Sequence, residues 1–124
     1  MKTKKGFTLI ELLVVITILG AVLSLVAPLG FQQIARSEAY SERLKFEDFI
    51  KEAKNYAFTH SSELVIELNG KSVSMYAVRY ETSKDYQFKH LFFERQTVLI
   101  NYHGFADREE IPAYVNGRAL DIEI

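Results

Sequence analysis

The 124-residue chain contains no cysteine, which excludes a disulfide framework and a thiolate metal site. This absence leaves the redox compartment open, because exported proteins can also do without cysteine. The chain also lacks an excess of basic charge, since 15 Lys and Arg against 16 Asp and Glu give a formal net charge of −1. Generic nucleic-acid binding requires a basic stripe that replaces counterions on phosphate. The sequence offers no such stripe.

Groups that could carry catalysis are equally sparse. The three histidines, His60, His90 and His103, are scattered over an expected linker, a strand and a turn. His90 with Glu94 and His103 could be imagined as metal ligands, but such sparse groups in strand-rich chains are usually surface residues. There is no Gly-rich phosphate loop and no nucleophile elbow. We therefore predict no enzyme activity, no cofactor and no metal.

Charged residues are absent from Leu12 to Phe31, and one acid, Glu11, stands at the start of this run. As a helix the uncharged run would be about 30 Å long, which matches the hydrocarbon core of a bilayer. A carboxylate carried into hydrocarbon costs about 2.5 to 3.5 kcal/mol on insertion scales. An interaction with another group therefore has to offset the free-energy cost of placing the Glu11 carboxylate there.

Three interpretations of the N-terminal segment compete: a secretory signal peptide, a plain membrane anchor and a processed assembly helix. The lysines at positions 2, 4 and 5 resemble the n-region of a signal peptide and favour a cytoplasmic N-terminus. However, the apolar run is longer than a typical h-region and starts with an acid. The sequence "SLVAPLG" is also a poor cleavage site.

The stretch "KKGFTLIELLVVITILGAVLSLVAP" resembles the N-terminus of type IV pilins and pseudopilins. The resemblance implies that a prepilin peptidase cuts after Gly6 and methylates the new amine of Phe7. It also implies that Phe7, Thr8 and Glu11 make the assembly contacts, with Glu11 paired to the Phe7 amine of a neighbouring subunit. Such a cation would make the buried acid tolerable. The alternative is that Glu11 snorkels to the lipid headgroups.

Gly20 and Pro28 bracket the second half of the apolar run. Pro28 has no N–H for the Ser24 carbonyl and its ring crowds that turn, so we expect a helix kink there. Pro28 also falls where many members of the family carry a kinking proline.

Beyond Phe31 the chain becomes charged, but an apolar stripe with helical spacing remains: Phe46, Phe49, Ile50, Ala53 and Ala57. No Gly or Pro interrupts residues 32–58, so we predict one helix over about residues 7–58. The remaining positions form an expected solvated face: Glu38, Glu42, Arg43, Lys45, Glu47, Asp48, Lys51, Glu52 and Lys54. We interpret the stripe as core rather than as a ligand site.

Strand signals begin near Glu63, after an expected linker at 59–63. Asn69-Gly70 and Asn116-Gly117 each lie between two strand-like runs and predict hairpins. Between them we predict strands at 71–80, 86–93 and 97–102, with a turn at 94–96. The sequence therefore predicts an α+β, pilin-like fold in which the C-terminal half of the helix packs on an antiparallel sheet.

The resemblance implies three segments. Residues 1–6 would be a leader peptide, 7–31 a transmembrane and assembly helix, and 32–124 a periplasmic globular domain. The chain would cross the inner membrane once, with its N-terminus cytoplasmic, before it enters a pilus or pseudopilus. The implied partners are the prepilin peptidase, other major and minor pilins or pseudopilins, and the inner-membrane assembly platform.

The C-terminal region "INYHGFADREEIPAYVNGRALDIEI" is similar to the GspH/FimT group of minor pilins and pseudopilins. We therefore expect a structural subunit of a type IV pilus or a type II secretion pseudopilus, in the initiating or tip complex. The alternative is a minor pilin that binds DNA during natural transformation, as some relatives do through a terminal Gly-Arg-x-Arg. Here Arg118 follows Gly117, but Leu120 replaces the second arginine, so Arg118 alone remains as a candidate DNA contact. A membrane-anchored enzyme is a third hypothesis, for which no group of residues supplies a site.

Overall fold

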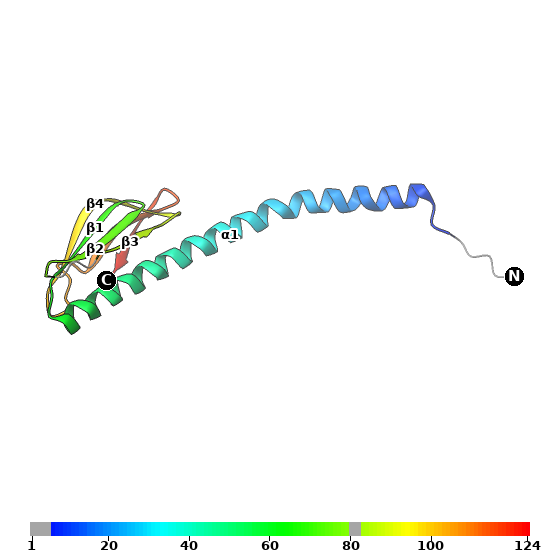
Figure 1. Cartoon of the computed structure of the whole chain (residues 1–124). Coiled ribbons are helices and arrows are strands. Elements are labelled where there is room, and N and C mark those ends of the chain that lie inside the picture. Colours follow the sequence, from blue (N-terminus) through cyan, green and yellow to red (C-terminus); the bar gives the residue numbers. More distant parts are fainter. Residues whose placement is uncertain (1–5, 80–82) are drawn as a thin grey trace. The chain divides into compact units, whose positions relative to one another are not determined.

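The computed structural model describes residues 6–79 and 83–124. One long helix, α1 (Leu9–His60), precedes a six-stranded sheet (Figure 1). The strands are β1 (Leu64–Gly70), β2 (Ser72–Ala77), β3 (Ser83–Gln87), β4 (Leu91–Ile100), β5 (Glu110–Val115) and β6 (Arg118–Glu123). The predicted α+β class is confirmed. The chain divides into two compact units, and the boundary between Arg36 and Ser37 lies within α1.

The N-terminal unit contains the apolar part of α1. By length and composition this helix is able to cross a membrane, and its large apolar side chains are exposed. Two polar side chains bond to their own backbone: Thr17 Oγ1 donates to the Leu13 carbonyl at 2.8 Å, and Ser24 Oγ donates to the Ala21 carbonyl at 2.7 Å. Both hydroxyls are thereby satisfied without water, as hydrocarbon surroundings require.

Both ends of α1 lie two residues later than predicted, and local hydrogen bonds explain each. At the start, the Leu12 N–H donates to the Thr8 carbonyl, so Thr8 is the N-cap and Leu9 the first helical residue. At the end, Ser61 has φ 47°, its N–H donates to the Phe58 carbonyl, and the Ser62 N–H donates to the Ala57 carbonyl. These two bonds form a Schellman motif. The expected linker therefore shortens to residues 61–63.

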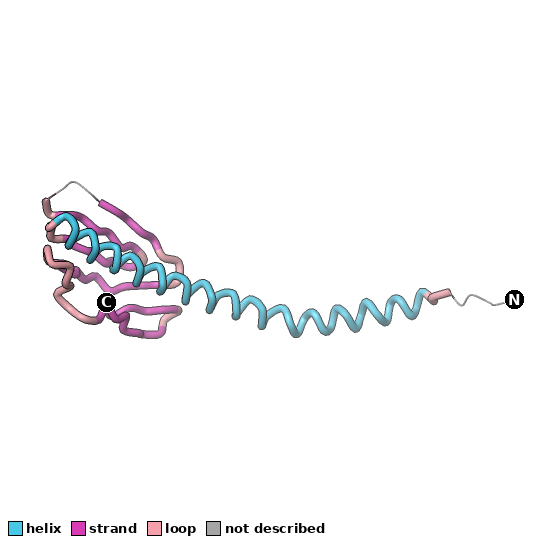
Figure 2. The backbone as a smooth tube through the Cα atoms, turned by 90° about the horizontal axis from the view of Figure 1, so that it is seen from below, coloured by secondary structure: helices cyan, strands magenta, loops and turns pink. Residues whose placement is uncertain are grey.

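The C-terminal unit is built on the predicted apolar stripe of α1. Its residues Phe46, Ile50, Ala53 and Ala57 are at most 1% exposed and pack on one face of the sheet (Figure 2). Each fully buried Phe or Ile contributes roughly 1.5 to 3 kcal/mol of transfer free energy. The prediction that this stripe forms the core is confirmed.

The sheet is antiparallel throughout, with strand order β3-β2-β1-β4-β5-β6. Both predicted hairpins are present. In the β5–β6 hairpin Asn116 and Gly117 have φ 50° and 79°, as a type I′ turn requires. In the β1–β2 hairpin Asn69 pairs with Ser72, so the two loop residues are Gly70 and Lys71 rather than Asn69 and Gly70.

The predicted turn at residues 94–96 is wrong, because β4 runs through it. Phe93 and Val98 are both fully buried although they are five residues apart, which regular alternation would not allow. The pairing of β4 with β1 shifts by one residue between Leu68 and Gly70, and this irregularity brings both side chains to the core face. The polar cluster that suggested a turn therefore marks a β-bulge.

The predicted strand at residues 86–93 is also wrong, since β3 ends at Gln87 and β4 begins at Leu91. The break has a cause in α1, because the backbone N–H groups of Lys89, His90 and Leu91 bond to the carboxylate of Glu42. The C-terminal end of the strand predicted before β3, at Tyr80, lies outside the described residues.

Two glycines provide a matched test of the fold. Gly104 (φ 81°) lies where a Cβ would be 2.9 Å from the Lys54 carbonyl oxygen, whereas Gly117 (φ 79°) faces open space. We expect Gly117→Ala to lower the free energy of unfolding by about 1–2 kcal/mol, the cost of left-handed backbone for an L-residue. Gly104→Ala should lower it further, because a helix carbonyl obstructs the new methyl group. Urea denaturation measures both, and equal losses would contradict the close approach of Gly104 to α1.

Candidate functional site

The N-terminal motif begins with an ordinary helix cap. The Glu11 N–H donates to Thr8 Oγ1 at 3.3 Å, which makes Thr8 the N-cap and places Glu11 in the first turn of α1. A carboxylate in the first turn is also favoured by the helix dipole. Gly6 and Phe7 precede the helix, and Phe7 is 81% exposed. Thr8 and Glu11 therefore shape the helix start in addition to any contact between subunits.

The compensating group for Glu11 does not lie within its own described chain. Glu11 is exposed, and its carboxylate makes no ion pair with any residue in 6–79 or 83–124. The predicted partner is the Phe7 amine of a neighbouring subunit, and this contact joins two chains. It stays a prediction, as does the bend at Gly20 and Pro28, through which α1 is continuous.

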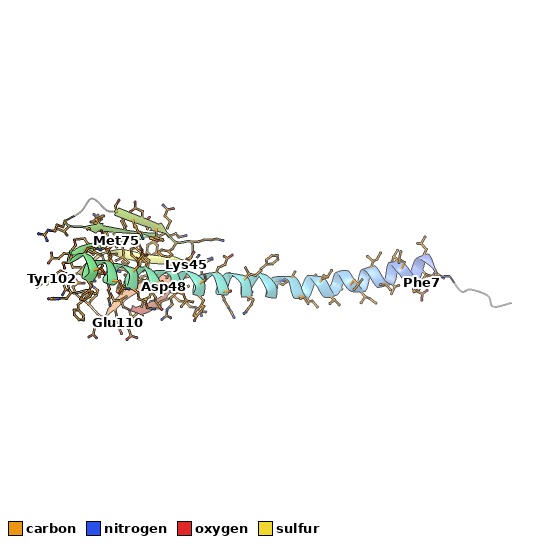
Figure 3. The ribbon with its side chains drawn as sticks, turned by 60° about the horizontal axis from the view of Figure 1, so that its bottom comes forward. Phe7, Lys45, Asp48, Met75, Tyr102 and Glu110 are labelled. Carbon is orange, nitrogen blue, oxygen red and sulfur yellow. The ribbon has the colours of Figure 1, made fainter. Side chains whose placement is uncertain are left out.

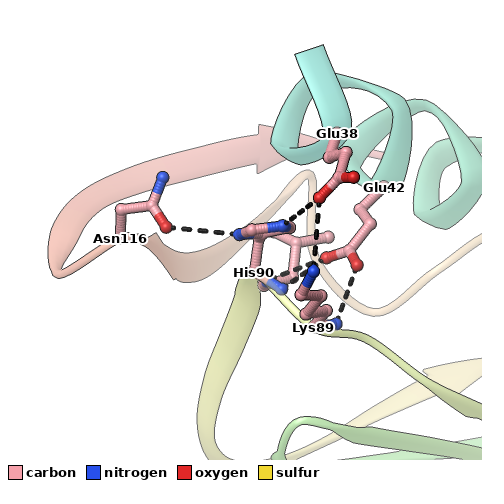
Figure 4. Close-up of polar contacts among 6 residues, drawn as sticks. Glu38, Glu42, Lys89, His90 and Asn116 are labelled. Carbon is pink, nitrogen blue, oxygen red and sulfur yellow. Dashed lines mark hydrogen bonds and ion pairs between the residues drawn. The ribbon is translucent and has the colours of Figure 1, made fainter. Parts of the chain in front are cut away.

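In the C-terminal unit one carboxylate of α1 holds the start of β4. Glu42 accepts backbone hydrogen bonds from Lys89 at 2.7 Å, His90 at 2.7 Å and Leu91 at 3.1 Å (Figure 4). Three consecutive N–H groups pointing at one anion form a backbone nest. Hydrogen bonds to a charged acceptor are the stronger kind. Glu42 therefore ties the helix to the sheet beyond the edge of the apolar core.

A second carboxylate lies one turn earlier and extends this contact. Glu38 Oε2 bonds to His90 Nε2 at 3.0 Å and accepts from Lys89 Nζ at 3.4 Å. The other ring nitrogen of His90, Nδ1, lies 3.4 Å from Asn116 Oδ1 in the β5–β6 turn (Figure 4). His90 thus connects α1 with the last hairpin. We call Glu38, Glu42, Lys89, His90 and Asn116 the helix clamp.

Both acids of the helix clamp are shifted toward their ionised forms. Partial burial opposes the ionisation of Glu42, but the three backbone N–H groups outweigh it and lower the pKa of its carboxyl. Hydrogen bonding from His90 and the charge of Lys89 lower the pKa of Glu38. Both carboxylates therefore stabilise the folded unit at neutral pH and lose that effect in acid.

The prediction that these charges form a solvated face is wrong for Glu42, which is half-buried; Glu38 is exposed as predicted, but it also contacts Lys89 and His90. A further member, Glu52, forms an ion pair with Lys84 of β3. A signal for the clamp is present in the sequence, because Glu38, Glu42 and Phe46 follow one another at i, i+4 spacing. The acids therefore lie on the row that continues into the core stripe.

The imagined metal ligands do not come together. His90 belongs to the helix clamp, Glu94 accepts a hydrogen bond from the Tyr114 hydroxyl at 2.9 Å, and the His103 ring lies beside Tyr102. Within the described part of the chain, no group of three or more His, Asp or Glu side chains could hold a metal ion.

The sheet face turned away from α1 is acidic. Four exposed acids on this face alternate with buried or half-buried residues, and Asp85 joins them because it pairs with Ser74: Glu67, Glu110, Asp121, Glu123 and Asp85. Arg118, the candidate DNA contact, is exposed at the start of β6 opposite Val115. Arg118 alternates with Asp121 and Glu123 along β6, so it lies on the same side of the strand as Ile122 and not on this face. The structure adds no second cation of the expected Gly-Arg-x-Arg pattern beside Arg118.

Gly6 and Phe7 precede an apolar helix that begins with the Thr8 cap and Glu11, the order expected of a prepilin-type N-terminus. The family model of the prokaryotic N-terminal methylation motif matches residues 1–27. Comparison with curated proteins and with solved structures gives no significant match. The motif supports membership of the type IV pilin and pseudopilin family as a structural subunit. It implies processing by a prepilin peptidase and assembly with other pilins, and the apolar helix fits a single-pass inner-membrane anchor.

The helix clamp makes a specific prediction about stability and pH. Glu42→Gln keeps the shape of the side chain but removes the charge and turns an NH₂ group toward backbone donors, so we expect a loss of about 2 kcal/mol at pH 7. Since the pKa of Glu42 in the folded unit lies below its ordinary value of 4.5, its contribution is present above that pH and is lost as pH falls through the lowered pKa.

Urea denaturation of wild type and variant between pH 3 and pH 7 measures both effects. The difference between the two proteins should shrink in acid. Asp48→Asn is the matched control, because Asp48 pairs only with exposed Lys51 at 3.7 Å and should cost little. A loss for Glu42→Gln that is the same at pH 3 and pH 7 would contradict an ionised clamp.

Proposed function

We propose that the chain is a minor pilin or pseudopilin, cleaved after Gly6 and methylated on Phe7. The subunit would act in the initiating or tip complex of a type IV pilus or a type II secretion pseudopilus. It would have no catalytic activity of its own. Its segments would be the leader at 1–6, the membrane and assembly helix at 7–31, and the periplasmic domain at 32–124.

The observation that carries this proposal is an acid at the start of an exposed apolar helix that has no cationic partner within residues 6–79 and 83–124. Glu11 lies four residues after Phe7, whose amine becomes a cation when the leader is removed. Within one chain the helix cap orients Thr8 and Glu11. Because leaving one buried charge alone is costly, pairing Glu11 with the Phe7 ammonium of a neighbour would favour assembly and set the axial register. A snorkelling acid would need neither Gly6 nor the cleavage motif.

The compact C-terminal unit supports a role as a displayed domain. All of the buried apolar residues of the described chain lie between Ala39 and Ile122. This unit therefore carries its own core, and the assembly helix makes no contribution to that core. Such a division lets the helix leave the bilayer for a filament without unfolding the head.

Processing and assembly can be tested together. We expect intact-mass spectrometry of the membrane-extracted protein to show loss of residues 1–6 and one added methyl group. Glu11→Ala and Glu11→Gln should be processed but should enter filaments at least about tenfold less, because the neighbouring ammonium then lacks its anion. Quantitative blotting of sheared filaments measures incorporation.

Thr17→Val is the matched control, since Thr17 is a polar residue of the same helix that bonds only to its own backbone. This variant should be incorporated normally. An intact N-terminus in cells with an active peptidase would refute the proposal, and so would normal incorporation of Glu11→Ala.

The alternative, DNA binding for natural transformation, depends on Arg118 alone, because Leu120 stands where the second arginine is expected. We expect a fragment starting at Ser37, which contains the whole core, to give no gel shift with DNA at low salt, where attraction to phosphate is greatest. Arg118→Ala should behave identically. A shift that is lost in Arg118→Ala would instead establish the alternative.

A further inference from the structure

Exposed apolar side chains gather at the end of the C-terminal unit where α1 stops. The exposed fraction of each residue is between 51% and 69%. The residues are Phe58, Val78, Leu99, Tyr102 and Phe105. Figure 3 shows Tyr102 at this end. Single exposed apolar residues are normal, but a contiguous group of large ones indicates an interaction surface.

Part of this group surrounds a cleft, which we call the distal cleft. It has a volume of about 240 Å³ and is lined by the apolar side chains of Val65, Val78, Leu99 and Phe105 and by two acids, Glu63 and Asp107. Small-molecule sites usually enclose about 300–1,000 Å³. The distal cleft is better suited to an apolar side chain of a protein partner with a cation beside it.

The wall of the distal cleft is rigid. Asn101 Oδ1 accepts from the N–H groups of His103 and Phe105 at 3.0 Å each, and the Asn101 N–H donates to the Phe105 carbonyl at 2.9 Å. Asp107 Oδ1 accepts from the Leu99 N–H at 3.2 Å. Phe105 is therefore exposed on a loop that is already ordered. Preordered aromatic residues bind with little entropic cost and are typical hot spots.

The complementary chemistry is present elsewhere on the same unit. Tyr40 and Leu44 lie at i, i+4 on α1 and are 63% and 42% exposed. Exposed Lys45 follows them and makes no ion pair within residues 6–79 and 83–124. We call Tyr40, Leu44 and Lys45 the proximal helix face. It offers apolar side chains beside a cation. The distal cleft offers an apolar recess beside the exposed acid Glu63, whereas Asp107 is already paired with Arg108 at 3.3 Å.

The distal cleft and the proximal helix face of one chain cannot contact each other. The distal cleft adjoins the end of α1, because Gly104 of its loop approaches Lys54 and Phe58. From Leu44 to Phe58 the helix rises about 21 Å. Figure 3 shows Lys45 along the helix and Tyr102 at its end. Contact between the surfaces therefore requires two molecules.

We propose that the distal cleft of one subunit receives the proximal helix face of a second copy of this chain. Leu44 or Tyr40 would enter the cleft, and Lys45 would face Glu63. Such a contact joins two different surfaces, so it is heterologous and leaves one distal cleft and one proximal helix face free on a pair of copies. This inference rests on the proposed function and adds to it a side-by-side arrangement of at least two copies.

Cysteine cross-linking tests the contact in the full-length chain, which has no cysteine of its own. We expect oxidation of assembled Leu44→Cys/Val78→Cys protein to give a ladder of disulfide-linked oligomers. Neither single variant should give a ladder, because a heterologous contact places two different positions together. Leu44→Cys/Gln87→Cys is the matched control, since Gln87 is exposed on β3 and does not line the cleft; it should give none.

Charge reversal in the Leu44→Cys/Val78→Cys protein tests whether the contact depends on opposite charges. Lys45→Glu and Glu63→Lys should each lower the ladder yield about tenfold, because like charges then face each other. The double variant should restore the yield. Both residues are exposed, so the fold of the unit should be unaffected, and urea denaturation checks this.

The outcomes separate this inference from the proposed function. Processed, filament-incorporated chains without a ladder overturn the inference and leave the proposed function intact. Cross-linking of Val78→Cys to a different subunit only, or efficient cross-linking by a single-cysteine variant, also overturns it. Chains that keep residues 1–6 in cells with an active peptidase overturn the proposed function, and the inference falls with it.

Discussion

The C-terminal unit depends on the burial of one helical stripe against one face of one sheet. Phe46, Ile50 and Ala53 meet β1 and β4 residues such as Ile66 and Phe93, and all five side chains are fully buried. Burial of this stripe requires the sheet to present a continuous apolar face, and the bulge in β4 meets that requirement where simple alternation would fail. The helix and the sheet therefore constrain each other, since neither buries its apolar side alone.

At the edge of this core, polar contacts attach the helix to the segment between β3 and β4. The helix clamp uses the ionised carboxylate of Glu42 to satisfy three backbone N–H groups that have left the sheet. A buried or half-buried N–H without an acceptor would cost about 1–3 kcal/mol. The break between β3 and β4 is thus a consequence of a side chain located 47 to 49 residues earlier. The same clamp brings His90 against the last hairpin.

Local patterns predicted the elements that have local causes. The stripe from Phe46 to Ala57 repeats at helical spacing, and the Asn-Gly pairs have a turn chemistry of their own. The helix ends were misplaced by only two residues because capping also acts locally. In contrast, the strand boundaries near Phe88 and Glu94 were wrong. Their causes are Glu42 and the pairing with β1, and neither can be read from the neighbouring residues.

By itself, the sequence determined the apolar helix with its capped acid at Glu11, the methylation motif and the α+β class, because each depends on residues within a few turns of one another. Only the tertiary structure decided that Glu38 and Glu42 bind the sheet, that β4 bulges, and that Glu63 and Phe105 share a cleft. The physical reason is how far apart in the sequence the interacting residues lie. Periodicity and capping act along the chain, whereas hydrogen-bond partners and recesses arise where distant segments are brought together by burial of the common core.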